Sequence, residues 1–67
     1  MVDTARLKKL RCNQGYFTAV EFAKALGMKS HNYRNRENGH VPFSAAEIVQ
    51  ICELLEIPLE EGIRVMC

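Results

Sequence analysis

Long hydrophobic runs are missing from this sequence, in which apolar residues never occur more than a few at a time. A membrane-spanning helix needs ~20 consecutive apolar residues, so we expect no segment to cross a bilayer. The first ten residues, MVDTARLKKL, also lack the apolar core of a secretory signal peptide. These two absences predict a cytoplasmic protein.

Paired cysteines are absent, because the three cysteines, Cys12, Cys52 and Cys67, lie far apart in the sequence. A disulfide scaffold would carry an even number, and a structural zinc site would carry paired ligands such as C-x-x-C. No glycine-rich phosphate loop is present, and the cysteines and histidines are scattered along the chain. We therefore expect ordinary thiols, no metal, no cofactor, no small-molecule ligand and no enzymatic activity.

Strand signals are absent too, because no stretch alternates at period two for long and no Asn-Gly or Asp-Gly turn separates β-branched runs. The composition, 48% hydrophobic and 25% charged, is that of a folded globule and not of a disordered chain. A chain of this length buries only ~60% of its unfolded surface, so its core must be small. The sequence predicts one all-α domain over residues 1–67.

Capping signals divide the chain into five predicted helices. Asp3 is a good N-cap, and Thr18 and Ser44 each open a capping box with a glutamate three residues later. Phe17 and Phe22 stand at the hydrophobic-staple positions of the second helix. Glycines and a proline supply the breaks between helices. Four of the predicted helices cover about residues 4–14, 18–26, 30–38 and 59–66, and the remaining one is capped at Ser44 and ends in the stretch 54–58.

Charge is segregated along the chain. Residues 1–40 hold eight of the nine Lys and Arg and three of the eight acids, a sum of +5, whereas residues 41–67 sum to −4. Such a chain can turn a basic face toward a polyanion and an acidic face away from it. From charge alone, chance variation among solvated helices stays open as the alternative.

The third predicted helix is unusually polar, and Tyr33 is its only large apolar anchor. Its other side chains include Lys29, His31, Arg34 and Asn35, which belong to the types that bond base edges and phosphates. A helix with this composition, placed after a short helix and a glycine turn, is a candidate recognition helix.

A larger pattern surrounds this helix. The order Thr18…Ala23…Leu26-Gly27-Met28…Tyr33…Glu37-Asn38-Gly39, followed by Pro42 and a capped helix ending in Leu54-Leu55-Glu56-Ile57-Pro58, resembles the lambda-repressor-like, Cro/repressor (XRE) family of helix-turn-helix DNA-binding domains. The resemblance extends over residues 5–66. It implies a compact five-helix bundle whose second helix lies across the DNA backbone and whose third helix enters the major groove.

The resemblance also implies roles for individual residues. The implied base contacts come from Ser30, His31, Arg34 and Asn35. Position and side-chain chemistry together give a phosphate-contacting set of Thr18, Lys29, Asn32, Arg36 and Asn38. Arg11 and Glu37 are implied to form a structural ion pair.

The sequence departs from the family pattern at three positions. Ala19 stands where the family usually has a DNA-contacting Gln, so that contact is lost. Lys29 replaces the usual Ser or Thr, so Ser30 is expected to cap the third helix. Arg36 stands where an apolar residue is common.

These features predict a sequence-specific transcriptional regulator, a small repressor of the phage or prophage type. We expect a homodimer on double-stranded DNA with half-sites ~34 Å apart. The expected dimer surface is Leu59, Ile63, Val65 and Met66, unless this edge merely closes the core. The alternative function is a helix-turn-helix protein-interaction module, antitoxin-like or regulator-binding, that uses the acidic region 47–61.

Overall fold

In the computed structural model, which describes residues 1–67, the chain forms five helices and no strand. They are α1 (Thr4–Asn13), α2 (Ala19–Leu26), α3 (Ser30–Glu37), α4 (Ala45–Leu55) and α5 (Leu59–Met66). The all-α prediction is confirmed. Four helices begin and end within one residue of their predicted bounds, and α4 begins directly after its predicted cap at Ser44. None of the five has the length and apolar content of a membrane span.

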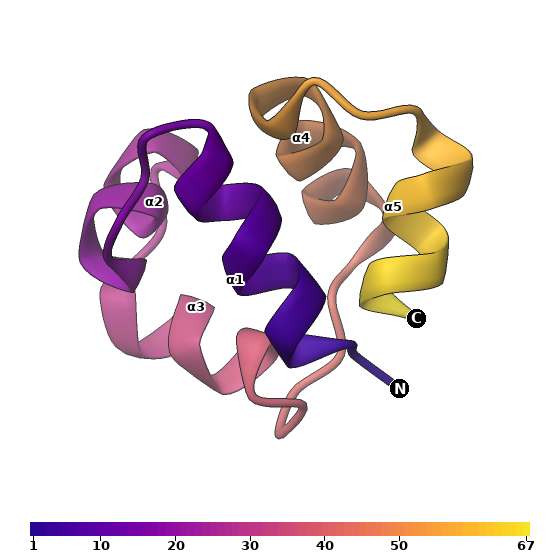
Figure 1. Ribbon diagram of the computed structural model, residues 1–67. Helices are drawn as coiled ribbons and strands as arrows, with labels where there is room; N and C mark the ends of the chain where they lie inside the picture. The colour runs from indigo at the N-terminus through magenta and orange to yellow at the C-terminus, as the bar shows by residue number, and fades with distance from the viewer.

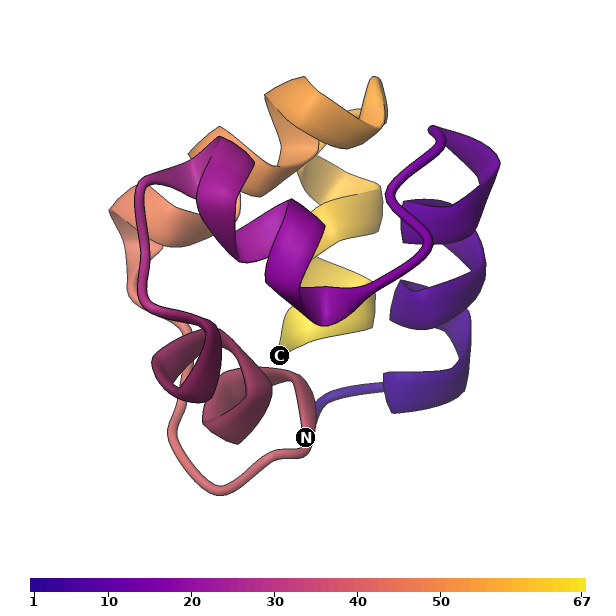
Figure 2. The ribbon, with the colours of Figure 1, turned by 90° about the vertical axis from the view of Figure 1, so that its left-hand side faces the viewer.

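The helices α2 and α3 lie on one side of the molecule and α5 lies on the other (Figure 1). When the molecule is viewed from the α2–α3 side, α5 lies behind (Figure 2). The two chain ends meet, since the amino group of Met1 donates to the Cys67 carbonyl and the Asp3 N–H donates to the Val65 carbonyl at 2.7 Å. The start of the chain therefore packs beside its last helix.

Side-chain caps fix the beginnings of three helices. The Asp3 carboxylate accepts from the Arg6 N–H at 3.2 Å, and Ser44 and Glu47 form both bonds of a capping box. At α2 the box is incomplete, because the Glu21 carboxylate accepts from the Thr18 hydroxyl and not from its backbone N–H.

The third helix begins without a side-chain cap. Lys29 is its N-cap residue and Ser30 already lies inside the helix, so the prediction that Ser30 caps α3 is wrong.

The core draws apolar side chains from every helix and is organised around a row of aromatic rings. Tyr16 meets Phe22 at 5.0 Å between ring centroids, Phe22 meets Tyr33 at 5.3 Å, and Tyr33 meets Phe43 at 6.3 Å. The first two pairs are edge-on and the third is tilted, and aromatic pairs at these separations add to the free energy of apolar burial. The buried apolar residues are Leu7, Phe22, Ala23, Leu26, Tyr33, Phe43, Ile48, Ile51, Cys52, Leu55, Val65 and Met66.

Two predictions about apolar residues need correction. Phe17 is 70% exposed, and Tyr16 packs against Phe22 in its place, because the Tyr16 N–H donates to the Arg11 carbonyl at 3.0 Å and holds Tyr16 at the end of α1. Val65 and Met66 are buried in the core, so they are not available as a dimer surface.

Gly62 brings α5 close to α4. A Cβ atom at Gly62 would lie 2.0 Å from the Cys52 Sγ, which is far inside van der Waals contact. Cys52 is buried, and none of the three cysteines is in a disulfide. The close approach of the two helices therefore requires a residue without a side chain at position 62.

Replacing Gly62 with Ala should destabilise the fold by ~1–3 kcal/mol, the usual range for overpacking a core. The clash outweighs the ~1 kcal/mol that Ala gains over Gly within a helix. In a Cys52→Ala background, where the obstructing sulfur is gone, the same change should be neutral or stabilising. Urea unfolding of the four chains measures this, and an equal loss in both backgrounds would contradict it.

Candidate nucleic-acid interface

The side chains of α3 point to three faces. His31, Arg34 and Asn35 are exposed, and at spacings of three and four residues they share one face. Tyr33 and Glu37 are buried. Asn32 and Arg36, one turn apart on the third face, are half-buried. The exposed face thus carries hydrogen-bonding side chains and no apolar one.

Tyr33 anchors α3 to the core. Its ring is fully buried between Phe22 and Phe43, while α3 supplies no other apolar side chain. Burial raises the pKa of the Tyr33 hydroxyl well above its usual range, and the nearby Glu37 carboxylate raises it further. The phenol is therefore neutral at physiological pH and serves as a packing group.

Arg11 and Glu37 attach α3 to α1. The Arg11 Nε lies 3.6 Å from the Glu37 Oε1, and the two side chains are only 7% and 3% exposed. Arg11 also donates to the Tyr16 carbonyl at 3.1 Å, and the Thr4 hydroxyl donates to the Glu37 carbonyl at 2.8 Å. Burial raises the pKa of the Glu37 carboxyl, although the positive charge of Arg11 opposes the shift. Each charge depends on the other, because an unpaired buried ion is costly.

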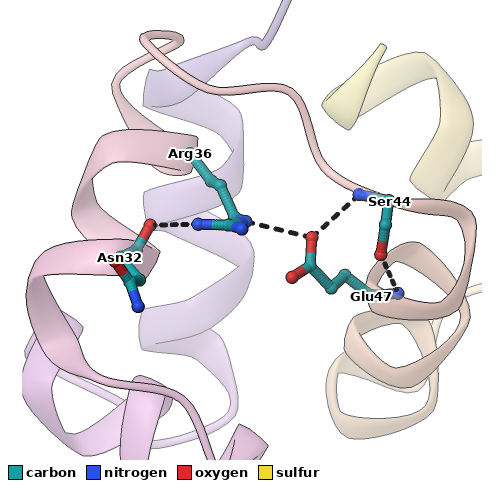
Figure 3. Close-up of polar contacts among 4 residues, drawn as sticks. All are labelled: Asn32, Arg36, Ser44 and Glu47. Atoms are coloured by element: carbon teal, nitrogen blue, oxygen red, sulfur yellow. Dashed lines mark hydrogen bonds and ion pairs between the residues drawn. The ribbon is translucent and has the colours of Figure 1, made fainter.

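Arg36 faces α4 (Figure 3). Its Nε lies 3.0 Å from the Glu47 Oε1, and its Nη1 donates to the Asn32 carbonyl at 2.9 Å. The structure thus gives the Arg36 guanidinium two partners within the chain, and the phosphate contact expected of Arg36 stays a prediction.

Glu47 takes part in both the ion pair and the α4 cap. Its Oε1 also accepts from the Ser44 N–H at 2.8 Å. Partial burial raises the pKa of the Glu47 carboxyl, but the hydrogen bond from Ser44 and the pairing with Arg36 outweigh it, so this pKa lies below its ordinary value. The carboxylate is therefore charged at neutral pH.

The other predicted site residues lie around α3. Thr18 and Lys29 are the exposed N-cap residues of α2 and α3, and Asn38 is the exposed C-cap residue of α3. Ser30 and Asn32 are half-buried.

Sequence reasoning missed Gln50, whose side-chain amide donates to the Leu26 carbonyl at 3.1 Å, at the turn between α2 and α3. It also missed the second role of Glu47. Gln50 could have been noticed as a polar residue among the apolar residues of α4. Nothing in the sequence near Glu47 indicates its ion pair with Arg36.

Basic and acidic side chains are separated in space as well as along the sequence. Lys29 and Arg34 are exposed at α3, whereas Glu53, Glu56 and Glu60 are exposed where α4 ends and α5 begins, away from α3 (Figure 1). The exposed side chains of α3 thus include no acidic one, because Glu37 is buried. No group of three or more His, Cys, Asp or Glu side chains is placed to hold a metal ion.

A helix-turn-helix family model matches residues 7–62, which include α2, the glycine turn and α3. The chain belongs to the Cro/C1-type helix-turn-helix family. The resemblance to Cro/repressor domains is confirmed, and this helix-turn-helix protein is a DNA-binding regulator in the general sense of its family. Comparisons with curated proteins and with solved structures give no match.

Replacing Arg11 with Met should destabilise this helix-turn-helix protein by ~3–5 kcal/mol at pH 7, because Glu37 is left as an unpaired buried charge. Without Arg11 the pKa of Glu37 rises further. A carboxyl whose folded-state pKa lies above its unfolded value, ~4.3, lowers stability as the pH rises from the unfolded to the folded pKa. The loss should therefore shrink as the pH falls.

Urea unfolding at pH 7 and pH 4.5 checks this prediction, with exposed Lys9→Met as the control. A variant that is unfolded at pH 7 should regain helical circular dichroism at pH 4.5. A loss of the same size at both pH values would show that the buried carboxylate is not its cause.

Proposed function

We propose that this protein is a sequence-specific transcriptional repressor of the small phage or prophage type, which reads the major groove of double-stranded DNA with α3. The exposed face of α3 is the observation that carries the proposal. An Arg such as Arg34 can donate two hydrogen bonds to guanine, and an Asn such as Asn35 can pair in the same way with adenine. The buried Tyr33 behind them supports this role, since it leaves their face free.

The proposed base contacts are made by His31, Arg34 and Asn35, with half-buried Ser30 at the edge of the surface. The proposed phosphate contacts come from Thr18, Lys29, Asn32 and Asn38. The N-cap positions of Thr18 and Lys29 support this assignment, because backbone N–H groups at helix starts bind phosphate. The backbone carbonyl of Asn32 accepts from Arg36, but the side-chain amide of Asn32 makes no hydrogen bond within the chain. Arg36 is left out because of its internal partners.

We further propose that two copies bind one operator, with half-sites ~34 Å apart. Leu59 and Ile63 lie one turn apart on α5 and are 48% and 47% exposed. Exposed apolar side chains at this spacing favour a helix-to-helix contact between copies. This pair of residues replaces the larger dimer surface expected from sequence.

Selection of bound duplexes from a random pool tests the proposal, because it measures binding, base preference and palindromy together. Affinity for the selected duplex should fall steeply with salt, as phosphate neutralisation requires. A chain that selects no duplex would instead favour the protein-interaction module.

Replacing Arg34 with Ala should weaken binding to the selected duplex by ~1–3 kcal/mol and relax the preference at one base position, since a bidentate base contact is lost. Arg64→Ala, which removes an exposed arginine from α5, is the matched control and should change neither quantity. Gel shifts and a repeated selection provide the measurements. An unchanged preferred sequence would refute the assignment of Arg34.

Replacing Ile63 with Ser should shift the protein toward monomer in sedimentation equilibrium, because an apolar contact between copies is lost. Affinity for a duplex with two half-sites should fall more than affinity for a duplex with one. Val49→Ser, at an exposed apolar position on α4, is the control. Equal sedimentation of wild type and Ile63→Ser would exclude this surface.

A further inference from the structure

Three hydrogen bonds connect the backbone of α3 to the backbone at the start of α4 (Figure 3). The Arg36 Nη1 donates to the Asn32 carbonyl at 2.9 Å, and the Arg36 Nε donates to the Glu47 Oε1 at 3.0 Å. The same Oε1 accepts from the Ser44 N–H at 2.8 Å. Both ends of the bridge are thus fixed to main chain, which restricts the ion pair to one geometry.

The Arg36–Glu47 bridge holds α3 on a face that the core contacts of this helix do not reach. Tyr33 and Glu37 are one turn apart and hold α3 along a single line on its buried side. Contacts along one line resist displacement of a helix but resist rotation about its axis weakly. Asn32 and Arg36 precede these two residues by one position each, so they lie about 100° around the helix, where a tie to α4 opposes rotation.

Rotation of α3 matters because base reading requires close geometry. Functional side chains must be held within ~0.5 Å and ~10–20° of their productive positions. His31 and Asn35 lie on the same helix as Arg36, so any turn of α3 moves them together. A rotation would misalign side chains with bases while leaving the overall charge near the phosphates almost unchanged.

The ion pair is sheltered enough for this role. The Arg36 and Glu47 side chains are 22% and 20% exposed, unlike the Arg6–Glu61 pair, whose Arg6 side chain is 54% exposed and whose charged atoms lie 3.8 Å apart. Fully exposed pairs contribute little, because water screens them and both side chains lose freedom. Glu47 is also held in place by its capping box with Ser44.

We propose that Arg36 and Glu47 are positioning residues for DNA recognition, which fix the rotation of α3 without touching DNA themselves. This inference rests on the proposed function. It assigns the pair to discrimination between sequences, whereas a phosphate contact would contribute to affinity for every sequence alike.

The experiment measures binding to a selected duplex and to a random duplex over a range of salt concentrations. The variants are Arg36→Ala, Glu47→Gln and the double variant, and Gln at position 47 can still serve in a capping box. The ratio of the dissociation constant for the random duplex to that for the selected duplex should fall about tenfold in Arg36→Ala and by a smaller factor in Glu47→Gln. Gln keeps the acceptor oxygen and removes only the charge, so Glu47→Gln weakens the bridge that Arg36→Ala breaks. The double variant should therefore lose no more than Arg36→Ala alone.

The slope of log affinity against log salt separates positioning from phosphate contact. It should stay unchanged in Arg36→Ala, whereas the loss of one phosphate contact lowers its magnitude by ~0.9. Lys29→Ala, at a proposed phosphate contact, is the positive control for that change. Glu53→Gln, which removes an exposed carboxylate from the same helix, controls for altered net charge.

Thermal unfolding by circular dichroism verifies that each variant is folded. If Arg36→Ala does not fold, Arg36→Lys replaces it, because Lys keeps the charge but lacks the forked donors of a guanidinium. A slope lowered by ~0.9 together with an intact ratio would make Arg36 a phosphate contact and overturn the inference. A ratio that survives both substitutions would also overturn it, while the proposed function stands. A wild type that binds neither duplex overturns the proposed function itself.

Discussion

The buried attachment of α3 is the constraint on which the rest of the structure depends. A helix that leaves its polar face open to solvent needs a strong hold on its other face, and α3 has one aromatic ring for that purpose. Tyr33 supplies the apolar contact, and Glu37 adds a buried charge that is paired with Arg11 on α1. The ring lies between Phe22 of α2 and Phe43 of the loop before α4, so α1, α2 and this loop all contribute to where α3 stands.

Three arginines show how burial assigns different tasks to the same side chain. Arg11 is buried and paired, Arg36 is half-buried and bridges two helices, and Arg34 is exposed. In water a guanidinium gains little from a single carboxylate, but its attraction grows as solvent is removed. The different exposure of these three arginines therefore gives them different roles. Arg11 pairs with Glu37 in the core, Arg36 links α3 to α4, and Arg34 keeps its hydrogen-bond donors free.

The helices could be predicted from sequence because their signals are local. Asp3, Thr18 and Ser44 cap the backbone within three residues of themselves, and Gly27 turns the chain through its own conformation. The family resemblance placed the exposed side chains of α3 and the ion pair of Arg11 with Glu37. The partner of Arg36 was not predictable in this way, because it depends on how α3 meets α4 in space. Phe17 was misjudged because adjacent aromatics, Tyr16 and Phe17, compete for one site, and only the backbone decides between them.

In a domain this small, a single side chain can serve more than one structural purpose. A core of this size leaves little free energy in reserve, so a side chain that satisfies several groups at once is favoured. Glu47 does so: one carboxylate oxygen completes the cap of α4 and holds Arg36. The cap would be needed in any helix that begins at Ser44. Because it already orders the carboxylate, the bridge to α3 forms with little further loss of side-chain freedom, which is why an ion pair can stand where an apolar contact is common in this family. Stability of α4 and orientation of α3 are thereby coupled through a single atom.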